Sequence, residues 1–193
     1  MRRRRQDRSE RSCKEDGVAA LEFAMVLPVL LLLLFGMVNF THYAYMQRKV
    51  ATAAQLMADL VTRAQTTITR DKIDDYFTAL ELSFRPMSQD RVKTNVGIDV
   101  YNYFLNAGTV QQRWSRFYES SNKTPKCTAP DTSPSSRIAD LAKTSDVVVA
   151  VVCMRYTAPV ANFPGFRFLS NINIERSFIL RPRETKTLSC TGC

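Results

Sequence analysis

The chain has 193 residues, of which 45% are apolar, and it carries a formal net charge of +9. This length corresponds to one domain, or two at most. The basic residues beyond the N-terminal segment form no dense cluster, so we expect no nucleic-acid partner. The sequence has no Ser-His-Asp set, glycine-rich phosphate loop or HExxH motif, and its only histidine is His42. We therefore expect no catalytic, cofactor-binding or metal-binding residues, and a protein that is not an enzyme.

Residues 1–17 form a basic leader with seven Lys or Arg residues against four acidic ones. A basic segment beside an apolar span is retained in the cytoplasm. We expect the leader to stay in the cytoplasm and the chain beyond the span to lie outside, in the periplasm or beyond, so that the chain crosses the membrane once.

The apolar residues are concentrated directly after this leader. Phe23 to Gln47 contain no Asp, Glu, Lys or Arg, and about 20 apolar residues are enough to cross a bilayer as a helix. Every face of such a helix is apolar, which is not typical of a helix in a soluble core. The stretch is also longer than that of a secretory signal, and no small-x-small cleavage site follows it directly, so we expect it to be retained.

The helical pattern extends past the span. Val50, Ala53, Met57 and Val61 recur at helical spacing. This spacing predicts a transmembrane and extended helix over residues 18–66, either continuous or interrupted by a short break.

Residues 67–193 read as an α+β domain with an antiparallel sheet. The expected elements are a helix over Asp71–Leu82, a hairpin of strands Val92–Tyr103 and Val110–Tyr118 with a turn near Asn106–Gly108, a surface loop over 120–137, a central strand over Asp146–Tyr156, and a last strand over Ile172–Leu180. Acid pairs such as Asp74 with Asp75, or Asp140 with Asp146, are explained more simply by exposed helix ends and turns than by acid–base chemistry.

Four cysteines lie beyond the span, while Cys13 belongs to the leader. In an oxidising compartment Cys127, Cys153, Cys190 and Cys193 are candidates for two disulfides, with three connectivities open. The Cys190–Cys193 pair has CxxC spacing, but no helix follows it to lower a thiol pKa, which favours a structural clip over a redox site.

Glu22 is a carboxylate at the mouth of the apolar span. A charge at bilayer depth costs about 2.5–3.5 kcal/mol, and less near the interface, so it usually has a partner. It could simply extend into the headgroups. Alternatively, cleavage after Gly17 would give Val18 a free α-amine one turn before Glu22, and this amine would be positively charged at neutral pH.

The stretch Gly17-Val-Ala-Ala-Leu-Glu-Phe23 resembles the prepilin cleavage motif of the tight-adherence (Flp) pilus system, in which a glycine precedes the cut and a Glu-aromatic pair follows. Over residues 16–58, with Pro28 and Gly36 also at matching places, the chain resembles the TadE-like family of minor pilins or pseudopilins.

The resemblance implies a long helix that crosses the inner membrane of a bacterium once and continues into a pilin-like extracytoplasmic domain in the periplasm. It also implies processing by a prepilin peptidase between Gly17 and Val18, and helix packing that involves Glu22, Phe23, Pro28 and Gly36. The expected function is pilus assembly and secretion, with the major Flp pilin, other minor pilins and the assembly platform as partners. Whether the role is TadE-type or TadF-type, and whether the chain enters the filament, are left open. The alternative is a single-span receptor or scaffold with a periplasmic binding domain.

Overall fold

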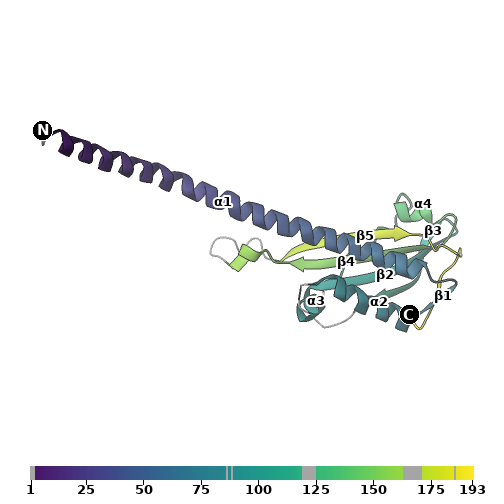
Figure 1. Cartoon of the computed structure of the whole chain (residues 1–193). Coiled ribbons are helices and arrows are strands. Elements are labelled where there is room, and N and C mark those ends of the chain that lie inside the picture. The colour runs from purple at the N-terminus through teal and green to yellow at the C-terminus, as the bar shows by residue number, and fades with distance from the viewer. Residues whose placement is uncertain (1–2, 86, 88, 119–124, 163–170, 185) are drawn as a thin grey trace. The chain divides into compact units, whose positions relative to one another are not determined.

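The computed structural model describes residues 3–85, 87, 89–118, 125–162, 171–184 and 186–193. The chain divides into two compact units, Met1–His42 and Tyr43–Cys193. The fold is α+β: a long N-terminal apolar helix is followed by a domain with a four-stranded antiparallel sheet (Figure 1).

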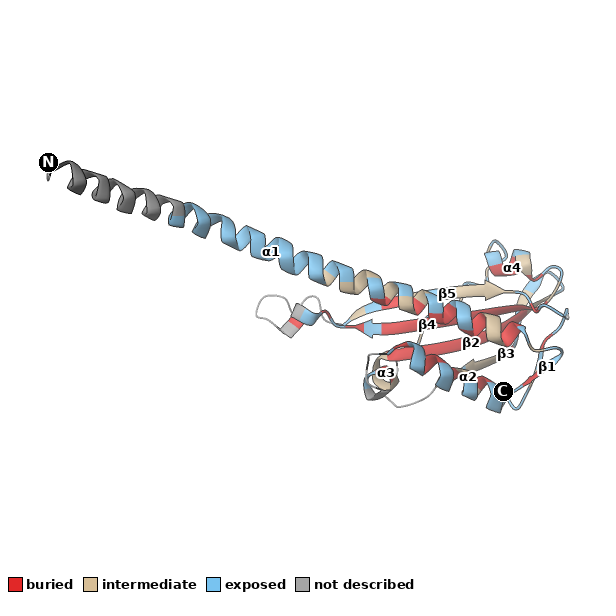
Figure 2. Cartoon of the chain, in the orientation of Figure 1, coloured by how far each residue is buried: buried red, intermediate tan, exposed pale blue. Residues whose placement is uncertain are grey.

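Helix α1, Arg3–Thr62, runs without a break, so the interrupted alternative is wrong. Pro28 lies inside it, where the ring removes one helical hydrogen bond. Between Leu21 and Phe40 the apolar side chains are exposed, and from Met46 onward one side of the helix is buried (Figure 2).

The four-stranded sheet has the order β3-β2-β4-β5, and every neighbouring pair is antiparallel. Its strands are β2 Val96–Asn106, β3 Thr109–Phe117, β4 Val147–Tyr156 and β5 Ile172–Leu180. Strand β4 is central and buried along nearly its whole length, as its continuous apolar run predicts. Strands β2 and β3 form the predicted hairpin, in which Ala107 and Gly108 both have positive φ, the backbone of a two-residue hairpin turn.

The core of the second unit lies between α1 and one face of the sheet. Alternate strand residues such as Ile98 and Val152 point to this face and pack with Val50, Met57 and Val61 of α1, all of them at most 1% exposed. Helical spacing and strand alternation thus bring two apolar surfaces together, which is the main source of stability for a helix packed on a sheet.

The remaining elements are short. Helix α2, Arg70–Ser83, matches the predicted helix and buries Ile73, Phe77 and Leu80. The others are α3 Gln89–Asn95, α4 Arg137–Leu141 and the 3-10 helix η1 Pro159–Asn162. Two three-residue strands, β1 Thr67–Thr69 and β6 Ser189–Thr191, form a separate parallel pair.

The predicted strand over Val92–Tyr103 is wrong at its start. Val92 belongs to α3, and β2 begins only at Val96. Both valines are buried in the same cluster, and a spacing of four residues fits one face of a helix as well as one face of a strand. Part of the predicted loop 120–137 lies outside the described residues, and the part from 125 to 133 has no regular structure.

Candidate functional site

The resemblance motif lies in the first unit, on α1. Gly17 and Val18 belong to the helix by their backbone, and Glu22 and Phe23 are exposed, with 61% of Phe23 accessible. Val18 and Glu22 are four residues apart, so they lie on one side of the helix and about 6 Å apart along its axis. Processing at this bond is not visible in an intact chain, and the roles of these residues therefore remain predictions.

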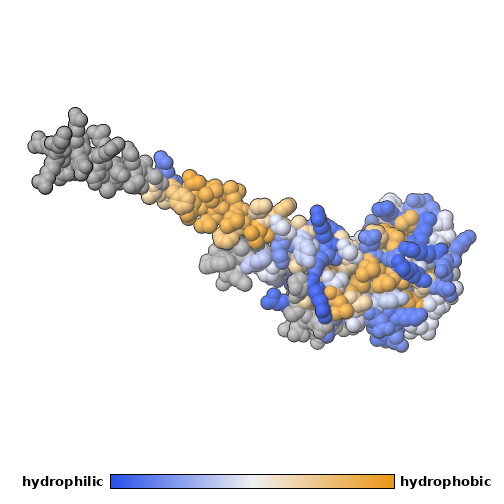
Figure 3. All heavy atoms as spheres, viewed as in Figure 1, coloured by the Kyte–Doolittle hydropathy of each residue, from blue (hydrophilic) through white to orange (hydrophobic). Residues whose placement is uncertain are grey.

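Fifteen large apolar side chains between Leu21 and Phe40 are exposed, by 38% or more each. Figure 3 shows this part of α1 as a continuous hydrophobic surface. Soluble monomers rarely expose contiguous apolar patches larger than a few hundred Å². The side chains of this segment therefore need lipid or other apolar helices around them.

Among the described residues, one helix is long and apolar enough to cross a membrane. It covers Ala20–Thr62, and its most apolar 18-residue window has a mean hydropathy of 2.5 with none of the window buried. The core helix of a soluble protein can have the same length and composition but is mostly covered by the rest of the protein, whereas this window is uncovered.

Gly36 lies within this exposed surface. A Cβ atom built on Gly36 would meet nothing within 4 Å. Packing within the described chain therefore gives no reason for a glycine at this position, unlike at Gly97, where the chain closes tightly over the backbone.

The second unit contains two disulfides, one of the three connectivities that the sequence leaves open. Cys127 bonds Cys153, with Cα atoms 5.4 Å apart, and Cys190 bonds Cys193, with Cα atoms 5.7 Å apart. The first joins the loop after β3 to the central strand. The second is a local clip at the C-terminal end of β6.

The Cys127–Cys153 bond holds a short strap, residues 125–128, against the sheet face opposite α1. A Cβ atom at Gly97 would lie 2.2 Å from the Pro125 carbonyl oxygen, so only glycine allows this approach. Glu175 of β5 accepts hydrogen bonds from the backbone N–H and the hydroxyl of Thr128, at 3.1 and 2.9 Å.

Asp99 of β2 lies beneath the same strap and is only 6% exposed. Burial raises its pKa to about 6; a hydrogen bond from the Cys127 backbone and the charge of Lys126 act in the opposite direction, while Glu175 adds to the rise. Burial also raises the pKa of the stacked neighbours Tyr101 and Tyr103 to about 12. The sequence analysis overlooked Asp99, although an acidic residue in the middle of an apolar strand was a visible signal.

Asp146 ties the C-terminal segment to the sheet. Its carboxylate is 3.0 Å from Arg113 Nε, and it accepts a hydrogen bond of 2.9 Å from the Leu188 N–H. The Trp114 indole N–H donates to the Leu188 carbonyl oxygen at 2.9 Å. Asp146 is only 2% exposed, so the expectation of an exposed helix end or turn is wrong at this residue, and these bonds give it a structural role.

Three of the four acidic residues in the candidate acid pairs have basic partners of their own. Asp74 is engaged by Arg116 at 3.0 Å, and Asp140 by Lys143 at 2.8 Å, which lowers the Asp140 pKa. Within the described part of the chain, no group of three or more His, Cys, Asp or Glu side chains could hold a metal ion.

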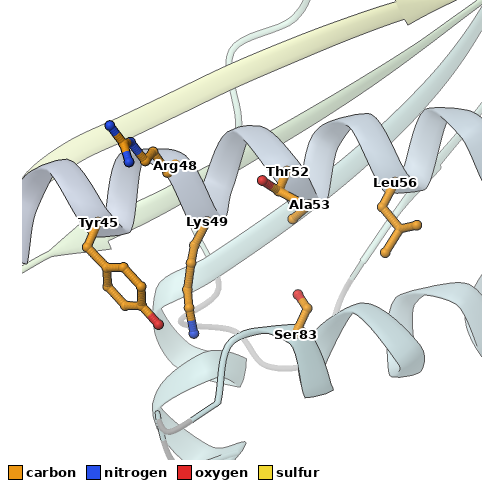
Figure 4. Close-up of a pocket in the computed structure, with 7 residues that line it drawn as sticks. All are labelled: Tyr45, Arg48, Lys49, Thr52, Ala53, Leu56 and Ser83. Atoms are coloured by element: carbon orange, nitrogen blue, oxygen red, sulfur yellow. The ribbon is translucent and has the colours of Figure 1, made fainter.

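A shallow pocket lies beside α1 in the second unit (Figure 4). The residues that line it are Tyr45, Arg48, Lys49, Thr52, Ala53, Leu56 and Ser83. Tyr45, Lys49 and Leu56 point toward α2, whereas the Arg48 guanidinium points away from it. Lys49 lies over the Tyr45 ring, 5.0 Å from its centroid, and donates to the Arg85 backbone carbonyl. The lysine is thus used in packing, and its ammonium group is not presented to a ligand in this pocket.

These features define an α+β protein with one exposed apolar helix of membrane-spanning length, stabilised beyond that helix by disulfides. Residues 17–59 match the model of the TadE-like protein family, so this segment is TadE-like, as its resemblance predicts. Comparison with curated proteins and with solved structures returns no match. TadE-like proteins are associated with the Tad pilus, and their part in it is structural.

Proposed function

We propose that the protein is a minor pilin or pseudopilin that acts in assembly of a tight-adherence (Flp) pilus. The observation that carries the proposal is the family match starting at Gly17, together with the exposed apolar helix that follows it. A helix of this kind can be stored in the membrane and can also pack with like helices in a filament. Nothing in this role requires catalysis by the chain itself.

In this proposal the basic leader lies in the cytoplasm and the second unit in the periplasm. A prepilin peptidase cuts between Gly17 and Val18. The new α-amine of Val18 has an ordinary pKa near 8 and is therefore positive at neutral pH. It can neutralise Glu22, either within one helix or across to a neighbouring subunit, which removes the cost of an unpaired carboxylate in apolar surroundings.

The partners in this proposal are the major Flp pilin, other minor pilins and the assembly platform. Glu22 and Phe23 at the start of the helix, and Pro28 and Gly36 further along, would form its packing surface. The open space around Gly36 supports this assignment, because a neighbouring helix could approach the backbone closely there.

Cleavage is tested by N-terminal sequencing of the full chain extracted from membranes, with and without a prepilin peptidase. We expect Val18 as the first residue only when the peptidase is present. A Gly17→Leu variant should keep its leader in both cases, while an Ala20→Ser variant, changed within the same motif but not at the cut, should still be processed. An intact N-terminus in the presence of an active peptidase would contradict the proposal.

Assembly is tested separately by comparing Glu22→Gln with the wild type. The substitution keeps the size of the side chain but removes its charge. We expect unchanged membrane levels but loss of co-purification with the major pilin. The alternative, a single-span receptor or scaffold, predicts an intact N-terminus and full tolerance of Glu22→Ala.

A further inference from the structure

The second unit carries a group of cations at the point where the chain enters it. This group, the junction cluster, consists of Arg48, Lys49, Arg85, Arg155 and Arg176. Each of these residues is connected to the first helical turns of the unit, residues 43–49. Two belong to these turns. Of the other three, Arg176 is bonded to the turns by its side chain and Arg85 by its backbone, and Arg155 is the neighbour of a residue that packs on them.

Three contacts bring the chain at these remaining residues to this end of the unit. Arg176 Nη2 donates to Gln47 Oε1 at 3.0 Å, and the backbone carbonyl of Arg85 accepts from Lys49 Nζ. Arg155 precedes Tyr156, whose ring packs on Tyr43 with centroids 5.6 Å apart.

The cluster surrounds the end of the sheet rather than one face of it. Met154 and Ile174 are buried against α1. Residues alternate along a strand, so Arg176 lies on the α1 side and Arg155 on the opposite side. Arg48, Arg85, Arg155 and Arg176 are all exposed.

The junction cluster has no acidic partners among the described residues. The described ion pairs involve Asp59, Asp74, Asp140 and Asp146, and none of them includes a member of the cluster. Glu175 is next to Arg176 in sequence, but its carboxylate binds Thr128 on the other face of the sheet. Among the residues that the structure describes, no carboxylate therefore neutralises the charge of the cluster.

This charge begins a short distance after the apolar span. Arg48 follows Phe40 by eight residues, or about 12 Å of helix. The headgroup layer adds roughly 5–8 Å to each side of the hydrocarbon core, and an arginine side chain can extend back toward it by several ångströms. Covalent continuity alone keeps the start of the second unit within reach of phosphate groups.

We propose that the arginines of the junction cluster bind the phosphate groups of anionic phospholipids and so hold the second unit against the membrane surface. Arginine suits this role because its planar guanidinium donates paired hydrogen bonds to phosphate oxygens. The inference depends on the membrane span and not on the pilus role, so it can stand if the proposed function fails.

The test measures which lipids remain bound to the full-length chain. The protein is exchanged into mixed micelles containing equal amounts of phosphatidylglycerol and phosphatidylcholine, repurified, and its bound lipids are quantified by mass spectrometry. The wild type is compared with the triple variant Arg48→Gln/Arg155→Gln/Arg176→Gln. Since each cation near a lipid surface changes binding by about fivefold, we expect enrichment in phosphatidylglycerol to fall at least about fivefold in the variant.

A matched control removes the same charge elsewhere in the second unit. Lys72, Arg137 and Lys186 are exposed and make no described ion pair. Arg137 and Lys186 are placed near the opposite end of β4, where Ile138 packs with Val147 and the Lys186 carbonyl accepts from the Asp146 N–H. The triple change to Gln at these three positions should leave the enrichment near the wild-type value.

The basic leader is the same in all three proteins, so its attraction for anionic lipid cannot cause a difference between them. Unchanged Trp114 fluorescence in the variants shows that the second unit is folded. Equal enrichment in all three proteins, or an equal fall in both triple variants, would overturn the inference. A cluster that binds an acidic protein surface instead of lipid would give equal enrichment in all three proteins. High salt should weaken the enrichment, because exposed charges are screened.

Discussion

Asp99 makes the stability of the second unit depend on pH. The carboxyl group is buried beneath the strap, and its pKa is raised from 3.8 to about 6. Between these two values the folded protein keeps a proton that the unfolded chain has lost. The contribution of Asp99 to stability is therefore fully present below about pH 4, where the group is protonated in both states. This contribution is lost as the pH rises through 6. This difference of about two between the folded and unfolded pKa values corresponds to about 3 kcal/mol of lost stability at neutral pH.

The perturbation is Asp99→Asn, which keeps an oxygen that can accept from the Cys127 N–H but cannot ionise. Relative to the wild type, the free energy of unfolding of the variant should increase by about 3 kcal/mol between pH 4 and pH 8. Denaturant unfolding of the full chain in detergent micelles, followed by fluorescence of the only tryptophan, Trp114, measures this difference at each pH.

The slope of the difference with pH is the diagnostic quantity, because the amide adds a constant offset if its N–H groups lack partners. Asp75→Asn, at an exposed position of α2, serves as the control. A difference between Asp99→Asn and the wild type that does not change from pH 4 to pH 8 would refute the reasoning. The reasoning would also be refuted if the variant lost stability relative to the wild type as the pH rises.

Three further predictions concern the covalent and polar ties of the second unit. Replacing Cys127 and Cys153 together by alanine should cost about 3.5 kcal/mol by the loop-entropy relation, because the bond closes a loop with a sequence separation of 26; an unchanged denaturant midpoint would contradict this. Gly97→Ala should lower the free energy of unfolding by about 1–3 kcal/mol, because its Cβ would overlap a backbone carbonyl of the strap. As a control, Gly36→Ala, with open space around it, should leave the thermal midpoint of the second unit unchanged. Asp146→Ala should lower stability by about 1–3 kcal/mol, because it leaves the buried Leu188 N–H and the partly exposed Arg113 guanidinium without their acceptor. A thermal melt within error of the wild type would contradict this and show that water replaces the carboxylate.

The sequence was sufficient wherever the deciding interaction is local or compositional. The apolar run after Glu22 predicts a membrane-length helix because every face is hydrocarbon, whatever it packs against. The run of valines before Cys153 predicts a central strand for the same reason, and Asn106-Ala-Gly108 predicts the turn of the hairpin because Gly108 tolerates positive φ.

The candidate functional segment was predictable for a related reason. Gly17, Val18, Glu22 and Phe23 form a contiguous motif, so its recognition needs no tertiary contact. The structure adds the exposure of Glu22 and Phe23 and the open space beside Gly36. The processing itself is a reaction of the chain with another protein and stays a prediction.

Contacts between distant segments were decided only by the tertiary structure. The pairing of β1 with β6 joins Thr67 to Ser189, and strands of three residues leave too little pattern to be seen in the sequence. The partner of Cys127 depends on the strap that crosses Gly97. The raised pKa of Asp99 and the contact of Arg176 with Gln47 likewise require the folded chain, because burial and contacts depend on positions in space and not on order along the chain.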